Sequence, residues 1–335
     1  MRMRIVAAAA LGLAWAGSAL AEEPIKITIA QTSIALGFAV VAIAADEGFY
    51  KNEGLDAEIQ IVSSGDPQVL AALHSGGAQF GAMTLVPAVQ AVARGEPLRL
   101  VAPFVREYVI QFVIHPDSAK KAGITQAMPL KEKYQRAKGL TVGTLDVGGG
   151  LHLMFKGLAK QYGLDPDRDY TVTAINSYPT LIAAAKRGQI DIALTAIPYG
   201  TVGVEKEGLE MLADFWNGAV PEFEGAMHQG MVTSAEFAEK QPDTVARMYR
   251  AIDGAEKFMH THGDQAVADL HKRYPNLAED IIHTFIVDDA KSYAASAVAS
   301  RKGFDIIRDF VAQNVLAQAS TVKYDDFVLP MAREK

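Results

Sequence analysis

The chain contains no cysteine among its 335 residues. Without a thiol it can form no disulfide bond, no thiolate metal site and no lipidated cysteine. A chain of this kind meets an oxidising compartment with no risk of mispaired bridges. The absence is therefore compatible with export and excludes a lipoprotein.

Long apolar runs are also scarce, and the clearest one stands at the very start. Arg2 and Arg4 open an apolar run over residues 5–20, and Ala19-Leu20-Ala21 supplies a small-x-small cleavage site. The run spans about 16 residues, short of the roughly 20 that a membrane-spanning helix needs. We predict a cleaved signal peptide at residues 1–21, rather than a membrane anchor, and a mature protein in the periplasm.

Basic charge is in deficit. Lysine and arginine together number 32 against 39 acidic residues, a formal net charge of −7. Nucleic-acid binding relies on clustered basic charge, so we expect no nucleic-acid partner. The negative net charge does not exclude an anionic ligand, because a binding site can be locally positive in a negatively charged protein.

Familiar catalytic motifs are missing as well. The sequence has no Gly-x-Ser-x-Gly elbow and no Gly-x4-Gly-Lys phosphate loop. The glycine run 148–150 does not complete the dinucleotide fingerprint Gly-x-Gly-x-x-Gly, because Leu153 stands where the last glycine is required. Acids such as Asp46 and Asp66 are scattered at predicted helix ends, which gives no support to a paired-carboxylate mechanism.

The eight histidines do not suggest a metal centre. His260 and His262 flank one residue, but two ligands without a third do not define a zinc site. We therefore predict a protein that is not an enzyme, with no catalytic residue, no metal and no cofactor.

What the sequence does contain is an internal repeat. Residues 25–84 and 138–195 each open with a β-rich run, pass through a loop of small residues, and continue into an apolar helix that ends at a glycine, Gly48 or Gly163. A second strand, a helix with a proline near its start and a third strand follow. The predicted pairs are strands 25–29 and 140–143, helices 38–47 and 151–162, strands 57–62 and 170–175, and strands 80–84 and 192–196.

A β-α-β-α-β pattern written twice predicts an α/β protein of two lobes, each a mostly parallel sheet flanked by helices. Residues 98–116 are expected to form the last strand of the first lobe and the crossing to the second. The polar stretch 222–234 is expected to be the return crossing. Helices are predicted at 242–260, 264–273, 276–285 and 299–317, forming a C-terminal tail mainly on the first lobe. The predicted boundaries are 22–110 plus 226–335 for lobe 1 and 111–225 for lobe 2, with the ligand cleft between them.

Ligands of open parallel sheets bind beyond the carboxyl ends of the strands. The loops 31–37 and 146–152 lie there, each before a helix N-terminus whose free N–H groups favour an acceptor or anion. The candidate ligand-binding residues from these loops, strand ends and crossings are Thr32, Ser33, Gly37, Phe38, Ser64, Gly65, Thr84, Arg106, Tyr108, Gly148, Gly149, Gly150, His152, Tyr178, Tyr199 and His228.

Each candidate has a plainer structural alternative. The glycine run 148–150 can be a simple strand-to-helix turn, and Ser64 an ordinary helix cap. Arg106 suits a carboxylate or sulfonate, but a surface ion pair with Glu107 explains it equally well. Structural roles are common for histidines such as His152 and His228. Trp216 can flank the cleft or belong to the core.

Four segments resemble a known family: residues 44–56, 70–76, 183–193 and 241–245. Together they are similar to the nitrate/sulfonate/taurine/thiamine-precursor group of ABC-transporter solute-binding proteins, over nearly all of residues 25–310. The resemblance implies a type II periplasmic-binding-protein fold that closes by hinge motion around its ligand.

The resemblance also implies a function. It is that of a periplasmic solute-binding component of an ABC importer, monomeric, with a permease of the inner membrane as partner. The expected solute is a small organic anion or heteroaromatic, such as a sulfonate, carboxylate or pyrimidine-like compound. Two alternatives remain: an enzyme of the pyrimidine-synthase type on the same fold, and a ligand-sensing partner of a membrane receptor. The export signal and the absence of that enzyme's cysteine-rich motif count against the synthase.

Overall fold

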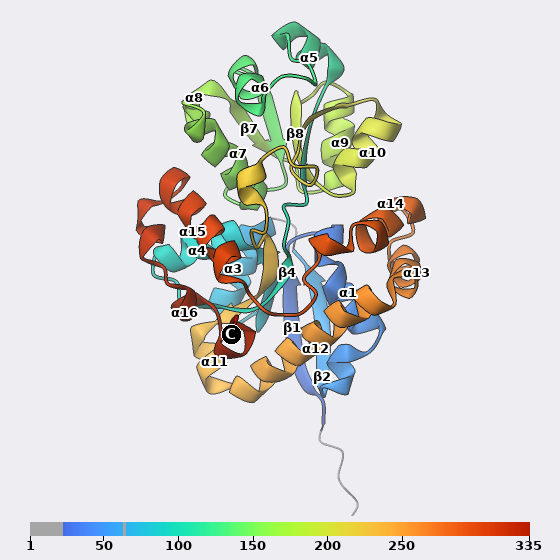
Figure 1. Cartoon of the computed structure of the whole chain (residues 1–335), viewed down its shortest axis with the longest axis vertical. Coiled ribbons are helices and arrows are strands. Elements are labelled where there is room, and N and C mark those ends of the chain that lie inside the picture. The colour runs from blue at the N-terminus through green and yellow to red at the C-terminus, as the bar shows by residue number, and fades with distance from the viewer. Residues whose placement is uncertain (1–22, 63–64) are drawn as a thin grey trace, which may run out of the picture.

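The computed structural model describes residues 23–62 and 65–335. The predicted signal peptide and the candidate Ser64 lie outside the described residues. Within the described ranges, the chain forms two lobes, each built around a five-stranded sheet (Figure 1). None of the helices in this part of the chain is long and apolar enough to span a membrane.

The first sheet has the strand order β2-β1-β3-β10-β4. Strands β1, β2 and β3 are parallel, and β10 runs antiparallel between β3 and β4. Every residue of β3 is buried, as expected for a central strand covered on both faces by helices. The strands are β1 (Ile25–Gln31), β2 (Leu55–Ile61), β3 (Phe80–Thr84), β4 (Leu98–Val105) and β10 (Gln229–Ser234).

The second sheet repeats this plan in the order β7-β6-β8-β5-β9. Here β6, β7 and β8 are parallel, and β5 is the antiparallel strand. In each sheet the antiparallel strand is the one that enters from the other lobe, so the predicted repeat is confirmed in the strand order. The strands are β5 (Ile110–Ile114), β6 (Thr141–Thr144), β7 (Thr171–Ala174), β8 (Ile192–Ala196) and β9 (Glu210–Asp214).

The two predicted crossings need correction. Residues 98–116 form two strands in different sheets, β4 and β5, and the first crossing is only residues 106–109. The expected polar return crossing ends in β10, a buried central strand. Polar residues in the sequence of β10 concealed the strand, and the fold buries them; the Thr233 hydroxyl, for example, donates to the Gln79 carbonyl at 2.7 Å. The second crossing is therefore residues 215–228.

Helices cover both sheets, and several of them lie where the sequence predicted helices. The helices expected at 38–47 and 151–162 are α1, preceded by a short 3₁₀ turn, and α7. The helices of the first lobe are α1 (Ala39–Asp46), α2 (Phe49–Asn52), α3 (Gly65–Ser75) and α4 (Leu85–Ala93). Those of the second are α5 (Pro116–Ala122), α6 (Leu130–Arg136), α7 (Gly150–Gln161), α8 (Pro166–Asp169), α9 (Tyr178–Lys186) and α10 (Tyr199–Glu207).

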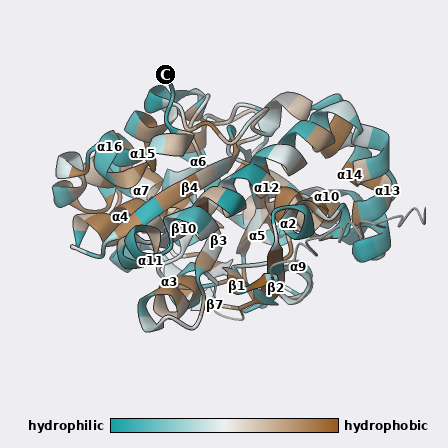
Figure 2. Ribbon diagram, turned by 90° about the horizontal axis from the view of Figure 1, so that it is seen from below, coloured by the Kyte–Doolittle hydropathy of each residue, from teal (hydrophilic) through white to brown (hydrophobic). Residues whose placement is uncertain are grey.

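The C-terminal tail packs against the first lobe and reaches the second. Helix α12 lies on α1, α2 and β4, whereas α15 contacts both α4 and α7. Helix α13, at the outside of the molecule, is largely hydrophilic (Figure 2). The tail helices are α11 (Ala235–Lys240), α12 (Pro242–Thr261), α13 (Gly263–Arg273), α14 (Glu279–His283), α15 (Arg301–Asn314) and α16 (Tyr324–Phe327), with a π-helical turn at Thr284–Asp288.

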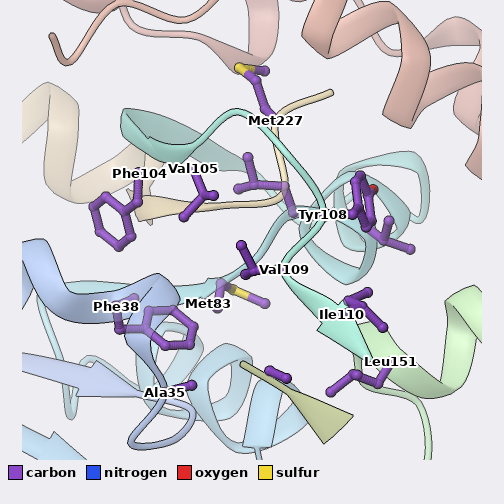
Figure 3. Packing of buried hydrophobic residues seen from close by; sticks show 14 of the residues in the cluster. Ala35, Phe38, Met83, Phe104, Val105, Tyr108, Val109, Ile110, Leu151 and Met227 are labelled. Atoms are coloured by element: carbon purple, nitrogen blue, oxygen red, sulfur yellow. The ribbon is translucent and has the colours of Figure 1, made fainter. Parts of the chain in front are cut away.

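The two crossings lie together where the lobes join. Figure 3 shows Tyr108, Val109 and Ile110 following one another between the sheets, with Met227 and Met83 close by. All five are buried. The connection between the lobes is therefore a packed hydrophobic unit.

Candidate ligand cleft

A cavity of about 830 Å³ lies between the lobes. This is within the range of roughly 300–1,000 Å³ that small-molecule sites occupy. Its walls come from the carboxyl ends of β1, β2 and β6, from the starts of α3, α9 and α10, and from residues 273–277 of the tail. Most of the lining is apolar, including Ile34, Ile61, Val62, Leu145, Pro179, Ile182, Val202, Pro275 and Leu277.

Two tyrosines form one wall of the cleft. The rings of Tyr178 and Tyr199 stack with centroids 4.7 Å apart and 25° between their planes. The hydroxyl of Tyr199 donates to the Ile34 carbonyl of the first lobe at 3.0 Å. Burial raises the pKa of Tyr199 to about 12, so its hydroxyl keeps its proton at neutral pH. The pair offers a flat aromatic surface to a ring-shaped ligand.

A second, much smaller space of about 20 Å³ borders the cleft. It shares Thr32, Ser33, Gly65, Leu145 and Tyr178 with the larger cavity. Such a volume accommodates about one water-sized group. We call this space the floor chamber. Its other lining residues are Phe38, Asp66, Thr84, Asp146, Gly150, Leu151, Ala196, His228 and Gln229.

Two buried carboxylates of the floor chamber hold the lobes together. Asp66, in the first turn of α3, accepts hydrogen bonds from the N–H of Gly150 at 2.8 Å and from the N–H of Thr84 at 3.0 Å. Asp146, in the loop before α7, accepts from the N–H of Asp66 at 2.9 Å. Each acid therefore occupies the N-terminus of the other lobe's helix, where free N–H groups and the helix dipole favour negative charge.

The same two carboxyl groups resist ionising together. Burial and the nearby charge of Asp66 raise the pKa of Asp146 to about 7, although the N–H of Asp66 partly offsets this. Burial also raises the pKa of Asp66, against the hydrogen bonds from Thr84 and Gly150. The pair is thus expected to gain a proton near neutral pH.

The structure brings nine of the candidate residues together at the cleft or the floor chamber. That they contact a solute stays a prediction. Ser177, the N-cap of α9, accepts from the N–H of Thr180 at 3.3 Å and also lines the cleft. The nine are Thr32, Ser33, Phe38, Gly65, Thr84, Gly150, Tyr178, Tyr199 and His228.

Three further candidates lie near the crossings instead. Arg106 begins the first crossing, and its positive charge acts on Glu256, where it lowers a pKa that burial raises. Tyr108 packs on His228 and on Phe223. Gly37 leaves room for a neighbour, because a Cβ there would collide with the Gln229 side chain. None of these three is among the described residues that line either space.

The remaining candidates, Gly148, Gly149 and His152, lie in or next to the loop before α7. His152 accepts the N–H of Gly148 through Nδ1 at 2.9 Å and lines a separate groove beside α4. Burial and the charge of Lys156 lower the pKa of His152 to about 4. Gly149 leaves space for Asp146, whose carboxylate a Cβ would meet.

Trp216 also lies away from the cleft. Its indole N–H donates to Ser292 at 3.0 Å, and the ring lines a pocket beside the second crossing.

The sequence reading missed three parts of the site: Asp146, Gln229 and the tail segment 273–277. The interpretation of Asp66 as one of several scattered acids is wrong, since the fold places it beside Asp146. The available signal was positional, because Asp146 follows β6 and Asp66 follows β2 at the edge where ligands bind.

Two α/β lobes joined by two crossings, with a cleft between them, define the class of periplasmic binding proteins. Within that class, the chain belongs to the family described as NMT1/THI5 like, whose model matches residues 36–266.

Solved structures of similar fold support the class assignment. A protein from Bordetella bronchiseptica RB50 superposes with a TM-score of 0.80 at 18% identity, covering 92% of this chain and 95% of its own. A ligand-binding component of an ABC-type import system from Staphylococcus aureus gives 0.69 at 18% identity, over 92% and 97%. The periplasmic aliphatic sulphonate binding protein SsuA of Escherichia coli gives 0.64 at 17% identity, over 88% and 94%.

Proposed function

We propose that this protein is the periplasmic solute-binding component of an ABC importer. It would capture a small organic molecule in the cleft and deliver the closed form to a permease of the inner membrane. The observation that carries the proposal is that one cavity of about 830 Å³ has walls from both lobes. The fold shared with the import component of Staphylococcus aureus and with SsuA supports the same role.

Hinge closure provides the mechanism. Residues 22–110 plus 226–335 and residues 111–225 would move as two bodies about the paired crossings. Closure would bring the Gly150 N–H onto Asp66 and the Tyr199 hydroxyl onto Ile34, two contacts that join the lobes across the cleft. The predicted signal peptide would deliver the chain to the periplasm, where it would act as a monomer.

We propose no catalytic step for this chain. The site is dominated by apolar and aromatic surface, which suits a bound organic solute, either an anion or a heteroaromatic. A pyrimidine-synthase activity and a sensory role with a membrane receptor remain the alternatives.

Native mass spectrometry of the purified mature chain tests the proposal. We expect a small molecule to copurify with the protein and to be detected bound to it in the mass spectrum. When this molecule is added to ligand-free protein, the radius of gyration measured by X-ray scattering should decrease. A chemical change of that molecule during incubation would favour an enzyme. Absence of any bound molecule, together with no compaction by a broad solute panel, would contradict solute binding.

A further inference from the structure

Another cavity, of about 340 Å³, lies between the two crossings that join the lobes. Its volume is at the lower end of the roughly 300–1,000 Å³ that small-molecule sites occupy. Every residue that lines it belongs to residues 106–109 or 215–228, and none of them is among the described residues that line the cleft or the floor chamber. We call this space the hinge pocket.

Aromatic rings form much of the wall of the hinge pocket. Tyr108 and Phe223 pack on each other with centroids 4.8 Å apart, and Trp216 packs on Phe285 at 5.5 Å. The indole N–H already donates to Ser292 at 3.0 Å, so Trp216 offers a ligand its ring. Rings held in place in this way attract organic cations to their faces. The aromatic residues of the wall are Tyr108, Phe215, Trp216 and Phe223.

The charged side chains that line the hinge pocket are both acidic. Glu107, in the first crossing, accepts a hydrogen bond from the Ser292 hydroxyl at 3.2 Å, and Glu224, in the second, is exposed. No lysine, arginine or histidine is among the described residues that line the pocket. Arg106 precedes Glu107 but does not line it, and its charge acts on the buried Glu256. Carboxylates beside aromatic faces favour a cation over an anion.

The wall also contains a buried polar group without a partner. The Tyr108 side chain is 3% exposed, and its hydroxyl makes no hydrogen bond with any described residue. Burial raises the pKa of Tyr108, so the hydroxyl keeps its proton at neutral pH. Buried hydroxyl groups normally have a partner, and a ligand that brings N–H donors would supply one.

We propose that the hinge pocket is a second ligand site, separate from the cleft, and that it binds a small primary ammonium compound with an apolar or aromatic group. The apolar part lies against the aromatic wall, and the ammonium group lies beside Glu107 and Glu224. Tyr108 stacks on His228, which lines the floor chamber, so one stacked pair separates this site from the cleft. A ligand here contacts both crossings at once and reduces their motion.

Fluorescence titration of the mature chain tests this site. The sequence contains two tryptophans, and Trp15 lies in the predicted signal peptide, so Trp216 is the one tryptophan after cleavage. The probes 2-phenylethylammonium, 2-phenylethanol and phenylacetate share a ring and differ in charge. We expect the ammonium probe to change the emission of Trp216 and to bind about tenfold more tightly than phenylacetate, with 2-phenylethanol between them.

Glu224→Gln tests whether the probe binds in the hinge pocket. The change keeps the shape of an exposed side chain and removes its charge, so the affinity for the ammonium probe should fall roughly two- to fivefold. Glu222→Gln, the same change at an exposed acid that does not line the pocket, should leave the affinity unchanged. Tyr199→Ala, which alters the cleft, should also leave it unchanged.

Hydrogen–deuterium exchange gives an independent readout of the same binding. The ammonium probe should slow exchange in residues 106–109 and 215–224, but not in the cleft loops 31–37 and 146–152. Equal affinity for the three probes would overturn the ligand class, and failure of all three to bind would overturn the site. Unchanged affinity in Glu224→Gln, or protection of the cleft loops alone, would also overturn the proposal. Solute binding in the cleft is measured separately, so none of these results decides the proposed transport role.

Discussion

The ring of Tyr108 stacks on the imidazole of His228, with centroids 4.5 Å apart and 20° between the planes. Tyr108 belongs to the first crossing and His228 ends the second, so the contact ties together the two segments that join the lobes. Burial lowers the pKa of His228 to about 3, so the imidazole stays neutral over the physiological range. The stacked pair therefore forms an uncharged centre between the crossings.

Removing the ring of Tyr108 should destabilise the protein. The side chain is 3% exposed, and truncating a buried aromatic ring to alanine costs about 3–5 kcal/mol. Tyr108→Phe is the matched control, because the hydroxyl has no hydrogen-bond partner in the described part of the chain. We expect it to be neutral or stabilising by about 1 kcal/mol. Urea unfolding measures the free energy of unfolding of both variants. Equal losses of stability in the two variants would contradict the conclusion that the buried ring, and not the hydroxyl, stabilises the crossings.

Gly150→Ala should prevent full closure. A Cβ at this position would lie 2.1 Å from the Thr84 Oγ1 of the opposite lobe. The lobe itself should tolerate alanine, since Gly150 lies in α7 without a positive φ. We expect solute affinity to fall at least tenfold and ligand-induced compaction to disappear, with little change in the melting temperature of the free protein.

Gly77→Ala serves as the comparison for Gly150→Ala. Its Cβ would make only an ordinary contact, 3.4 Å from the Ser75 hydroxyl. X-ray scattering with and without solute distinguishes the two variants. Normal compaction of Gly150→Ala would show that the lobes do not close along this contact.

The free energy of unfolding should depend on pH through Asp146. Its pKa in the folded chain is about 7, above the value of about 3.9 for an unfolded aspartate. The carboxyl group therefore favours the folded state most below pH 4, and this contribution is lost as pH rises from about 4 to 7. Measured against Asp146→Asn, wild-type stability should fall by up to about 1.4 kcal/mol per pH unit in that window.

Urea unfolding at several values between pH 4 and pH 8.5 checks this dependence. The difference between the two proteins is the useful quantity, because it cancels the titration of groups that do not interact with Asp146. A constant difference across the window would mean that Asp146 ionises normally in the folded chain.

Tyr199→Phe should weaken solute binding slightly. The change removes the hydrogen bond to Ile34 across the cleft but keeps the ring stacked on Tyr178. A neutral hydrogen bond is worth about 0.5–1.5 kcal/mol, so calorimetry should give a loss of roughly two- to tenfold in affinity. Tyr199→Ala, which also removes the ring, should lose more. Equal losses would assign the whole effect to the hydroxyl.

Much of the fold could be predicted because its signals are local. Strands at 80–84 and 192–196 are mostly apolar in sequence and buried throughout, and the glycines at 48 and 163 follow the C-cap residues of α1 and α7 with positive φ. Strand β10 escaped prediction because polar residues interrupt its apolar pattern, and the partner of the Thr233 hydroxyl, the Gln79 carbonyl, lies far along the chain.

The candidate site was predicted in part for the same reason. The loops beyond β1, β3 and β8 follow from the topology rule for parallel sheets, and the structure brings Thr32, Thr84 and Tyr199 together there. Arg106 lines neither space, and its charge acts on Glu256; that it contacts a solute stays a prediction, because a position at a strand end does not reveal the direction of a side chain.

The sequence by itself determined two repeated α/β halves, because hydrophobic periodicity and glycine positions act over a few neighbouring residues. Only the tertiary structure decided that Asp66 and Asp146, 80 residues apart, occupy each other's helix N-terminus, and that residues 273–277 complete the cleft. The chemical properties of the cleft depend on charges and N–H groups that folding brings together. The distances between these groups cannot be derived from their separation along the chain.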